Sequence, residues 1–85
     1  MVIQVRYAGL ARNIAGKRHE DLELRPGSTL SDLMDRIADT IGEGINNPEL
    51  IIVVHNHKGY FPKEWPNRHL QDGDEVLIIS NIAGG

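Results

Sequence analysis

The chain has 85 residues, 40% of them hydrophobic and 25% charged, with a formal net charge of −3 and no cysteine. This length and composition predict one small globular domain over residues 1–85, and the lack of cysteine excludes disulfides, thiolate metal ligands and thiol nucleophiles. The nine basic and twelve acidic residues look scattered along the chain, so we expect no basic stripe for nucleic acid and no anionic membrane partner.

The first strand is expected at residues 2–8, where apolar and polar side chains alternate with the period of a half-buried strand. Residues 9–17 break this alternation and predict a structured connection. Within it, Leu10 and Ile14 stand at a helical spacing of four, which would tuck a short turn against the core.

A second strand is expected where Leu22 and Leu24 alternate with charged residues. Pro26-Gly27 is a breaker pair that ends it. We expect the first two strands to pair as an antiparallel hairpin.

The most regular element is a helix that begins at Thr29-Leu30-Ser31-Asp32, a sequence that resembles a capping box. Apolar residues then recur at the helical spacing and form one buried face: Leu30, Leu33, Met34, Ile37, Ala38 and Ile41. Gly42 and Gly44 are typical of a helix end.

The second half of the chain predicts two further strands and a tail. Residues 50–54 form an unbroken apolar run, typical of a strand that is covered on both faces or central in its sheet. Residues 55–70 are irregular apart from a short strand expected near Tyr60. Asp72-Gly73-Asp74 is a turn signal before a strand at 76–79, and residues 80–85 lose all regular pattern and form the tail.

This order of elements, with one main helix among four or five strands, predicts an α+β roll. A helix between the second and third strands favours a mixed sheet in which the first and last strands lie side by side and parallel. No apolar run reaches the roughly 18 residues of a membrane span, and the N-terminus has no basic leader, so a cytoplasmic location is expected.

Three stretches of the sequence resemble the ubiquitin-like sulfur carriers of molybdopterin and thiamine biosynthesis, the MoaD/ThiS family, which has the β-grasp fold. They are residues 7–16, residues 27–33 and residues 70–85. In the last stretch an Asp-Gly-Asp turn, a strand and a final Ala-Gly-Gly most resemble the small subunit of molybdopterin synthase. The family often has an aromatic residue and two prolines before its tail, where this chain has Ile79-Ser80-Asn81.

The resemblance implies a sulfur carrier that is not itself an enzyme. Its C-terminal residue, here Gly85, would be adenylated and converted to a thiocarboxylate, while Ile82, Ala83 and Gly84 would form the tail that partners bind. The implied partners are an adenylating enzyme of the MoeB/ThiF type, which uses ATP, a sulfur donor protein and the large subunit of molybdopterin synthase. No cofactor would be bound to the carrier.

The residues themselves agree with this chemistry. Gly84 and Gly85 lack Cβ atoms, so the backbone can thread a narrow active site that side chains would block. Three alternatives stay open: a carrier for thiazole formation, a ubiquitin-like modifier joined to lysines, and an interaction module whose tail has no chemical role.

Two other groups of residues are candidate sites. A metal site would need the side chains of His55, His57 and His69 close together. We favour the alternative that these histidines lie in a solvated polar loop. Tyr60, Phe61 and Trp65 would form either a partner-docking surface or a cluster that covers the sheet edge. Of these three we expect Trp65 to be the most exposed.

Overall fold

The computed structural model describes residues 1–42 and 51–80. The elements are β1 (Val2–Gly9), α1 (Leu10–Ala15), β2 (His19–Glu23), α2 (Leu30–Ile41), β3 (Ile51–His55), β4 (Lys58–Tyr60), the 3-10 helix η2 (Pro62–Asn67) and β5 (Glu75–Ser80). Within those ranges no helix combines the length and the apolar character needed to cross a membrane.

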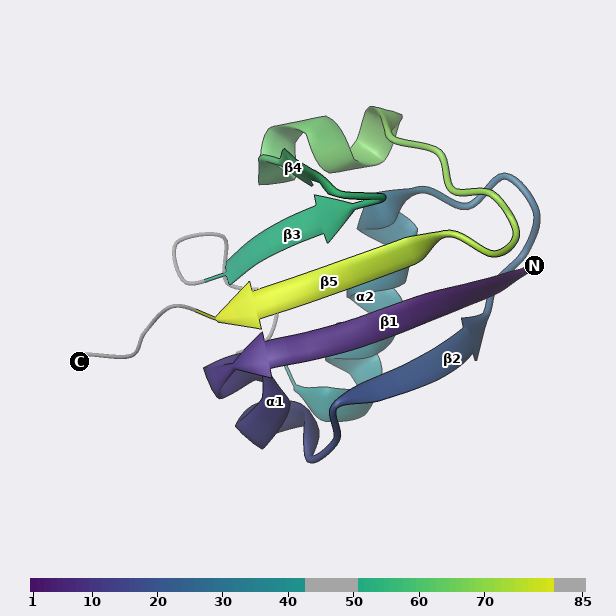
Figure 1. Cartoon of the computed structure of the whole chain (residues 1–85). Helices are drawn as coiled ribbons and strands as arrows, with labels where there is room; N and C mark the ends of the chain where they lie inside the picture. The colour runs from purple at the N-terminus through teal and green to yellow at the C-terminus, as the bar shows by residue number, and fades with distance from the viewer. Residues whose placement is uncertain (43–50, 81–85) are drawn as a thin grey trace.

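The strands form one mixed sheet in the order β2-β1-β5-β3-β4 (Figure 1). β1 and β5 are parallel neighbours at its centre, as predicted from the element order, and the other neighbouring pairs are antiparallel. The expected hairpin of β1 and β2 is therefore confirmed. β4, expected near Tyr60, is a short edge strand.

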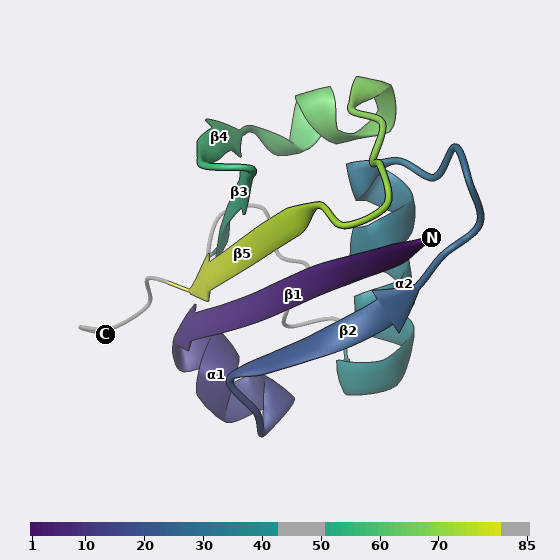
Figure 2. The same ribbon diagram turned by 45° about the vertical axis from the view of Figure 1, so that its right-hand side comes forward.

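Helix α2 crosses one face of this sheet, and the core lies between the two (Figures 1 and 2). Alternate residues of β1, β3 and β5 point toward the helix and are buried. From α2 the buried side chains are Leu30, Leu33, Met34 and Ile37. One helix on one face of a mixed sheet is the α+β roll that the sequence predicts.

The predicted capping box at the start of α2 is confirmed. The Asp32 backbone N–H donates to Thr29 Oγ1 at 3.2 Å, and the Thr29 backbone N–H donates to Asp32 Oδ2 at 2.9 Å. These two bonds satisfy backbone donors that the first turn of a helix leaves unpaired. Gly42 ends the helix with a φ of 119°, while Gly44 lies outside the described residues.

The structured connection after β1 is the short helix α1, but the residues expected to hold it against the core were wrong. Ala11 is fully buried, whereas Leu10 is partly exposed and Ile14 is 39% exposed. The helix begins directly after Gly9, so its phase turns Ala11 toward the sheet. A spacing of four alone could not fix that phase.

Candidate functional site

The predicted tail residues Ile82, Ala83, Gly84 and Gly85 lie outside the described residues. The structure does describe the place from which the tail starts. β5 is the central strand of the sheet and ends at Ser80, at the edge toward which β1 also runs (Figure 1).

Gly9 and Ser80 form the base of the tail. They are the last matched pair of the parallel β1 and β5 strands. Gly9 has a φ of 64°, and a Cβ atom built on it would lie 2.5 Å from the carbonyl oxygen of Ser80. Only glycine fits so close to that carbonyl in this conformation. The Ser80 side chain is buried, and its Oγ has no hydrogen-bond partner among residues 1–42 and 51–80.

An apolar patch lies next to this base on the sheet face opposite α2. The side chains that alternate outward there are partly or fully exposed: Ala8, Ile52, Val54, Leu77 and Ile79. The strand register places Ile79 between Ala8 and Ile52, close to the end of β5. We refer to these five residues as the open-face patch.

Sequence reasoning missed this patch because it allowed the apolar run at residues 50–54 to be covered on both faces. The structure confirms that the strand in this run, β3, lies between two other strands, but one of its faces is open, with Ile52 48% exposed. A signal was present, since a single helix can cover only one face of a sheet. The apolar residues left over had to face outward.

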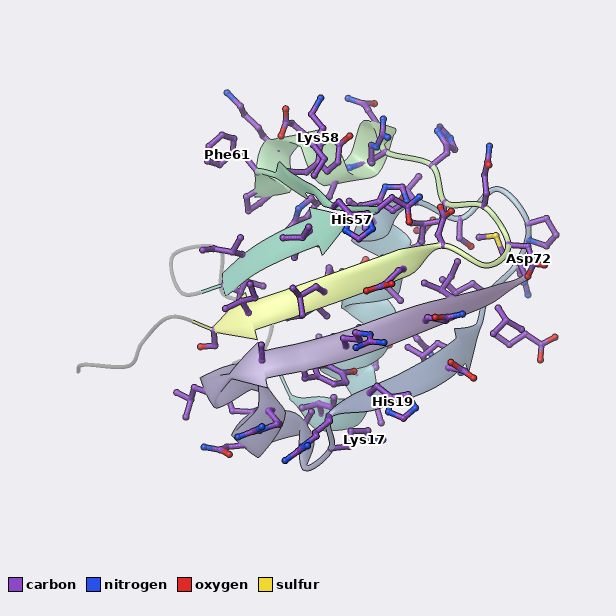
Figure 3. The ribbon with its side chains drawn as sticks, in the orientation of Figure 1. Lys17, His19, His57, Lys58, Phe61 and Asp72 are labelled. Carbon is purple, nitrogen blue, oxygen red and sulfur yellow. The ribbon has the colours of Figure 1, made fainter. Side chains whose placement is uncertain are left out.

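The aromatic residues Tyr60, Phe61 and Trp65 are divided by the fold. Phe61 is 71% exposed and projects from the molecule (Figure 3), Tyr60 is partly buried, and Trp65 is only 5% exposed. The expectation that Trp65 is the most exposed was therefore wrong. η2 packs against α2 and turns the indole inward, where its Nε1 donates to the Tyr60 carbonyl at 3.2 Å.

The Asp-Gly-Asp turn lies at the opposite end of β5 from the tail. Asp72 Oδ1 accepts from the Val2 backbone N–H at 2.7 Å, and the Gly73 N–H donates to the Val2 carbonyl at 2.8 Å. Gly73 has a φ of 85°, which favours glycine. The turn thus fastens the start of β1 beside the start of β5, a structural role.

His55 ends β3 with its ring buried, so the expectation of a solvated loop histidine was wrong at this position. Its Nε2 lies 2.7 Å from Asp74 Oδ2, and Arg68 Nε donates to its Nδ1 at 3.3 Å. Because Nδ1 accepts, the ring hydrogen is on Nε2 and is donated to Asp74. Burial by itself would raise the pKa of Asp74, but the hydrogen bonds it accepts, first from Asn56 and then from His55, hold that pKa below its ordinary value.

The other two histidines agree with the solvated-loop interpretation. His57 and His69 are exposed, and His57 has a positive φ of 74° in the turn between β3 and β4. His69 lines a shallow polar depression together with His55, Arg68 and Asp74. Within residues 1–42 and 51–80, no three His, Cys, Asp or Glu side chains gather closely enough to hold a metal ion.

The chain is similar to known proteins over nearly all of its length. A model of the ThiS family matches residues 5–85. The molybdopterin synthase sulfur carrier subunit of Chlamydomonas reinhardtii is 29% identical over 85 residues, which cover all of both chains.

Two solved structures share the fold. SAMP1 from Haloferax volcanii matches with a TM-score of 0.81 at 15% identity, over 100% of both chains. A chain of the complex of subunits 1 and 2 of the molybdopterin-converting factor from Helicobacter pylori matches with a TM-score of 0.68 at 18% identity, again over 100% of both chains. At such identities the likeness concerns the fold alone, and it confirms the predicted β-grasp roll.

Proposed function

Because this chain belongs to the ThiS family of sulfur carriers, we propose that it carries sulfur as a thiocarboxylate on the carboxyl group of Gly85. The observation that carries this proposal is the family match, which continues through residues 82–85 to the Gly-Gly pair. We further propose that residues 1–85 form one β-grasp domain whose working part is the tail. The sequence predicted the tail at residues 80–85, but Ser80 is the buried last residue of β5, so the tail follows it at residues 81–85.

The proposed chemistry has two steps. The Gly85 carboxylate attacks the α-phosphate of ATP in the active site of an adenylating enzyme, which forms an acyl adenylate and releases pyrophosphate. In the second step the terminal sulfur of a persulfide on a donor protein attacks the acyl carbon and displaces AMP, which gives an acyl disulfide. A second thiol of the partner proteins then cleaves the S–S bond, so that a disulfide forms on the partners and the carrier is left with a thiocarboxylate. A free carboxylate is a poor electrophile, so the first step is what makes the second one possible.

The carrier's own part in this scheme is to present a thin, inert tail. Gly84 and Gly85 add no side chains to the reacting end, and the chain has no cysteine that would intercept the activated carbonyl. The groups that move protons and bind ATP would belong to the partner enzymes. This agrees with the non-catalytic character of the family.

We propose that the acceptor pathway is molybdopterin formation and that the large subunit of molybdopterin synthase binds both the tail and the open-face patch. The full-length similarity to the carrier subunit of Chlamydomonas reinhardtii supports this assignment. The patch supports it physically, since exposed Ile52 and partly exposed Leu77 and Ile79 offer apolar surface beside the tail. Exposed Phe61 would extend this contact with the large subunit. We also propose that the protein is located in the cytoplasm.

The test is the intact mass of the chain after incubation with ATP, an adenylating enzyme of this class and a persulfide donor. Conversion of the terminal carboxylate raises the mass by the difference between sulfur and oxygen. A variant with one residue added after Gly85 has the same folded domain and should gain no mass. Loading of the extended variant, or no loading of the natural chain by any such enzyme, contradicts the proposal.

The acceptor is tested with the loaded protein. Sulfur should pass to a pterin precursor in the presence of the large subunit of molybdopterin synthase and not to the thiazole-forming system. Transfer to thiazole alone would assign the chain to thiamine biosynthesis. Isopeptide conjugates on lysines in cell extract, absent when Gly85 is deleted, would identify a protein modifier.

A further inference from the structure

The charged residues are less evenly distributed than expected, because the start of the chain carries basic residues only. Residues 1–19 contain four Lys or Arg and no Asp or Glu, although the whole chain has a net charge of −3. Four exposed basic residues of this segment follow one another from α1 through the loop to the start of β2: Arg12, Lys17, Arg18 and His19. We refer to these four residues as the basic corner.

The helix that carries Arg12 starts beside the base of the tail. Gly9 is matched with Ser80 across the parallel strands, and α1 begins at the next residue and packs against β5. The loop then returns along β1, where the Arg18 carbonyl accepts from the Tyr7 backbone N–H at 2.8 Å. Figure 3 shows Lys17 and His19 at the same corner of the molecule, on the side of α1 and β2.

The charge of the corner is only partly balanced inside the described residues. Lys17 Nζ lies 3.3 Å from Glu20 Oε1, and the same carboxylate also accepts from the Tyr7 hydroxyl at 2.6 Å. The ion pairs within residues 1–42 and 51–80 include neither Arg12 nor Arg18. Two guanidinium groups are therefore free of ion pairs with that part of the chain.

We propose that the basic corner docks against an acidic surface on the adenylating enzyme that activates the tail, an inference that rests on the proposed function. A protein that binds the tail must come close to α1, because the tail and α1 both start at the same edge of the sheet. Guanidinium groups pair with carboxylates through two parallel hydrogen bonds. Exposed charges at the rim of an interface mainly accelerate association and fix its orientation.

Nucleic acid is the less suitable occupant. Two arginines and one lysine neutralise few phosphates, and the net charge of −3 opposes a polyanion. A local cationic surface on an anionic protein is better matched to a local acidic surface, which orients the carrier with its tail toward the active site.

The test compares two double variants in ATP–pyrophosphate exchange with the adenylating enzyme from the same cells. R12E/R18E reverses the charge of the two arginines of the corner. The matched control, R25E/K58E, makes the same change in net charge at the opposite end of the sheet. Arg25 follows the end of β2, and Lys58 starts β4 opposite His55, the last residue of β3. Both control positions are exposed.

We expect R12E/R18E to lower kcat/KM by about tenfold or more at low salt, through a higher KM with kcat retained. The defect should shrink at about 0.5 M salt, where the screening length is only a few ångströms. R25E/K58E should stay within about twofold of the natural chain, and equal urea midpoints of both variants show that the fold is retained.

Equal kcat/KM values for the two variants overturn the docking proposal while leaving the proposed function standing. If the natural chain is not adenylated at all, the proposed function fails and the docking proposal fails with it. Binding of a DNA duplex at physiological salt, lost in R12E/R18E only, would also overturn the assignment by making nucleic acid the occupant.

Discussion

Replacement of Gly9 by alanine tests the close approach of β1 to the end of β5. The new Cβ would lie 2.5 Å from the Ser80 carbonyl oxygen, and the obstacle is backbone, which cannot rotate away. The residue would also keep a φ of 64° with a ψ of −142°, a region that is almost restricted to glycine.

The expected cost has two parts. A non-glycine residue in such a region costs about 1–3 kcal/mol, and forcing an extra methyl group into packed structure costs about 1–3 kcal/mol. Together the free energy of unfolding should fall by about 2–6 kcal/mol, a large share of the roughly 5–15 kcal/mol of a typical domain.

Urea unfolding measures this loss, with the fluorescence of the single tryptophan, Trp65, as the signal. Gly16→Ala is the matched control, because Gly16 also has a positive φ of 75° but has nothing within 4 Å of the position of a Cβ. The control should cost about 1–2 kcal/mol from conformation alone. If Gly9→Ala costs no more than Gly16→Ala, the close approach to Ser80 does not constrain the fold.

Two further predictions concern side chains at the other end of the sheet and near β4. Because the pKa of Asp74 is lower in the folded chain than in the unfolded chain, the contribution of Asp74 to stability is complete above about pH 4 and is lost as the pH falls through the folded pKa. Asp74→Asn should lower the free energy of unfolding by about 1–3 kcal/mol at neutral pH and should weaken the loss of stability at acid pH, measured by urea unfolding. An unchanged loss of stability at acid pH would contradict this. Trp65→Ala should lower the free energy of unfolding by about 3–5 kcal/mol, measured by thermal or urea unfolding followed by circular dichroism. Phe61→Ala, at an exposed position, should change stability by less than about 0.5 kcal/mol and weaken binding to the large synthase subunit. If Phe61→Ala cost more stability than Trp65→Ala, the burial of Trp65 would be refuted.

The helix α2 could be predicted almost completely, because its signals are local. Its capping box, apolar period and terminal glycine lie within one continuous stretch, and each acts within a turn or two of the chain. The parallel pairing of β1 with β5 also followed from the order of elements, since a mixed sheet around one helix leaves few topologies.

The misjudged residues depend on contacts across the sequence. Trp65 is buried because η2 meets α2, and His55 is buried because Asp74 and Arg68 approach it from a distant segment. The sequence around Trp65 and around His55 does not indicate either of these contacts. The concentration of positive charge in residues 1–19 was visible in the sequence, but its place beside the tail depends on how α1 follows Gly9.

The parallel arrangement of β1 and β5 has a mechanical consequence. Met1 precedes the start of β1, and Ser80 stands at the far end of β5, so tension applied at these two points pulls the neighbouring strands past each other along their length. The hydrogen bonds between the two strands then bear the load together and must break at the same time, instead of breaking one after another. A force applied between residues 1 and 80 therefore meets more resistance than one that peels the two strands apart.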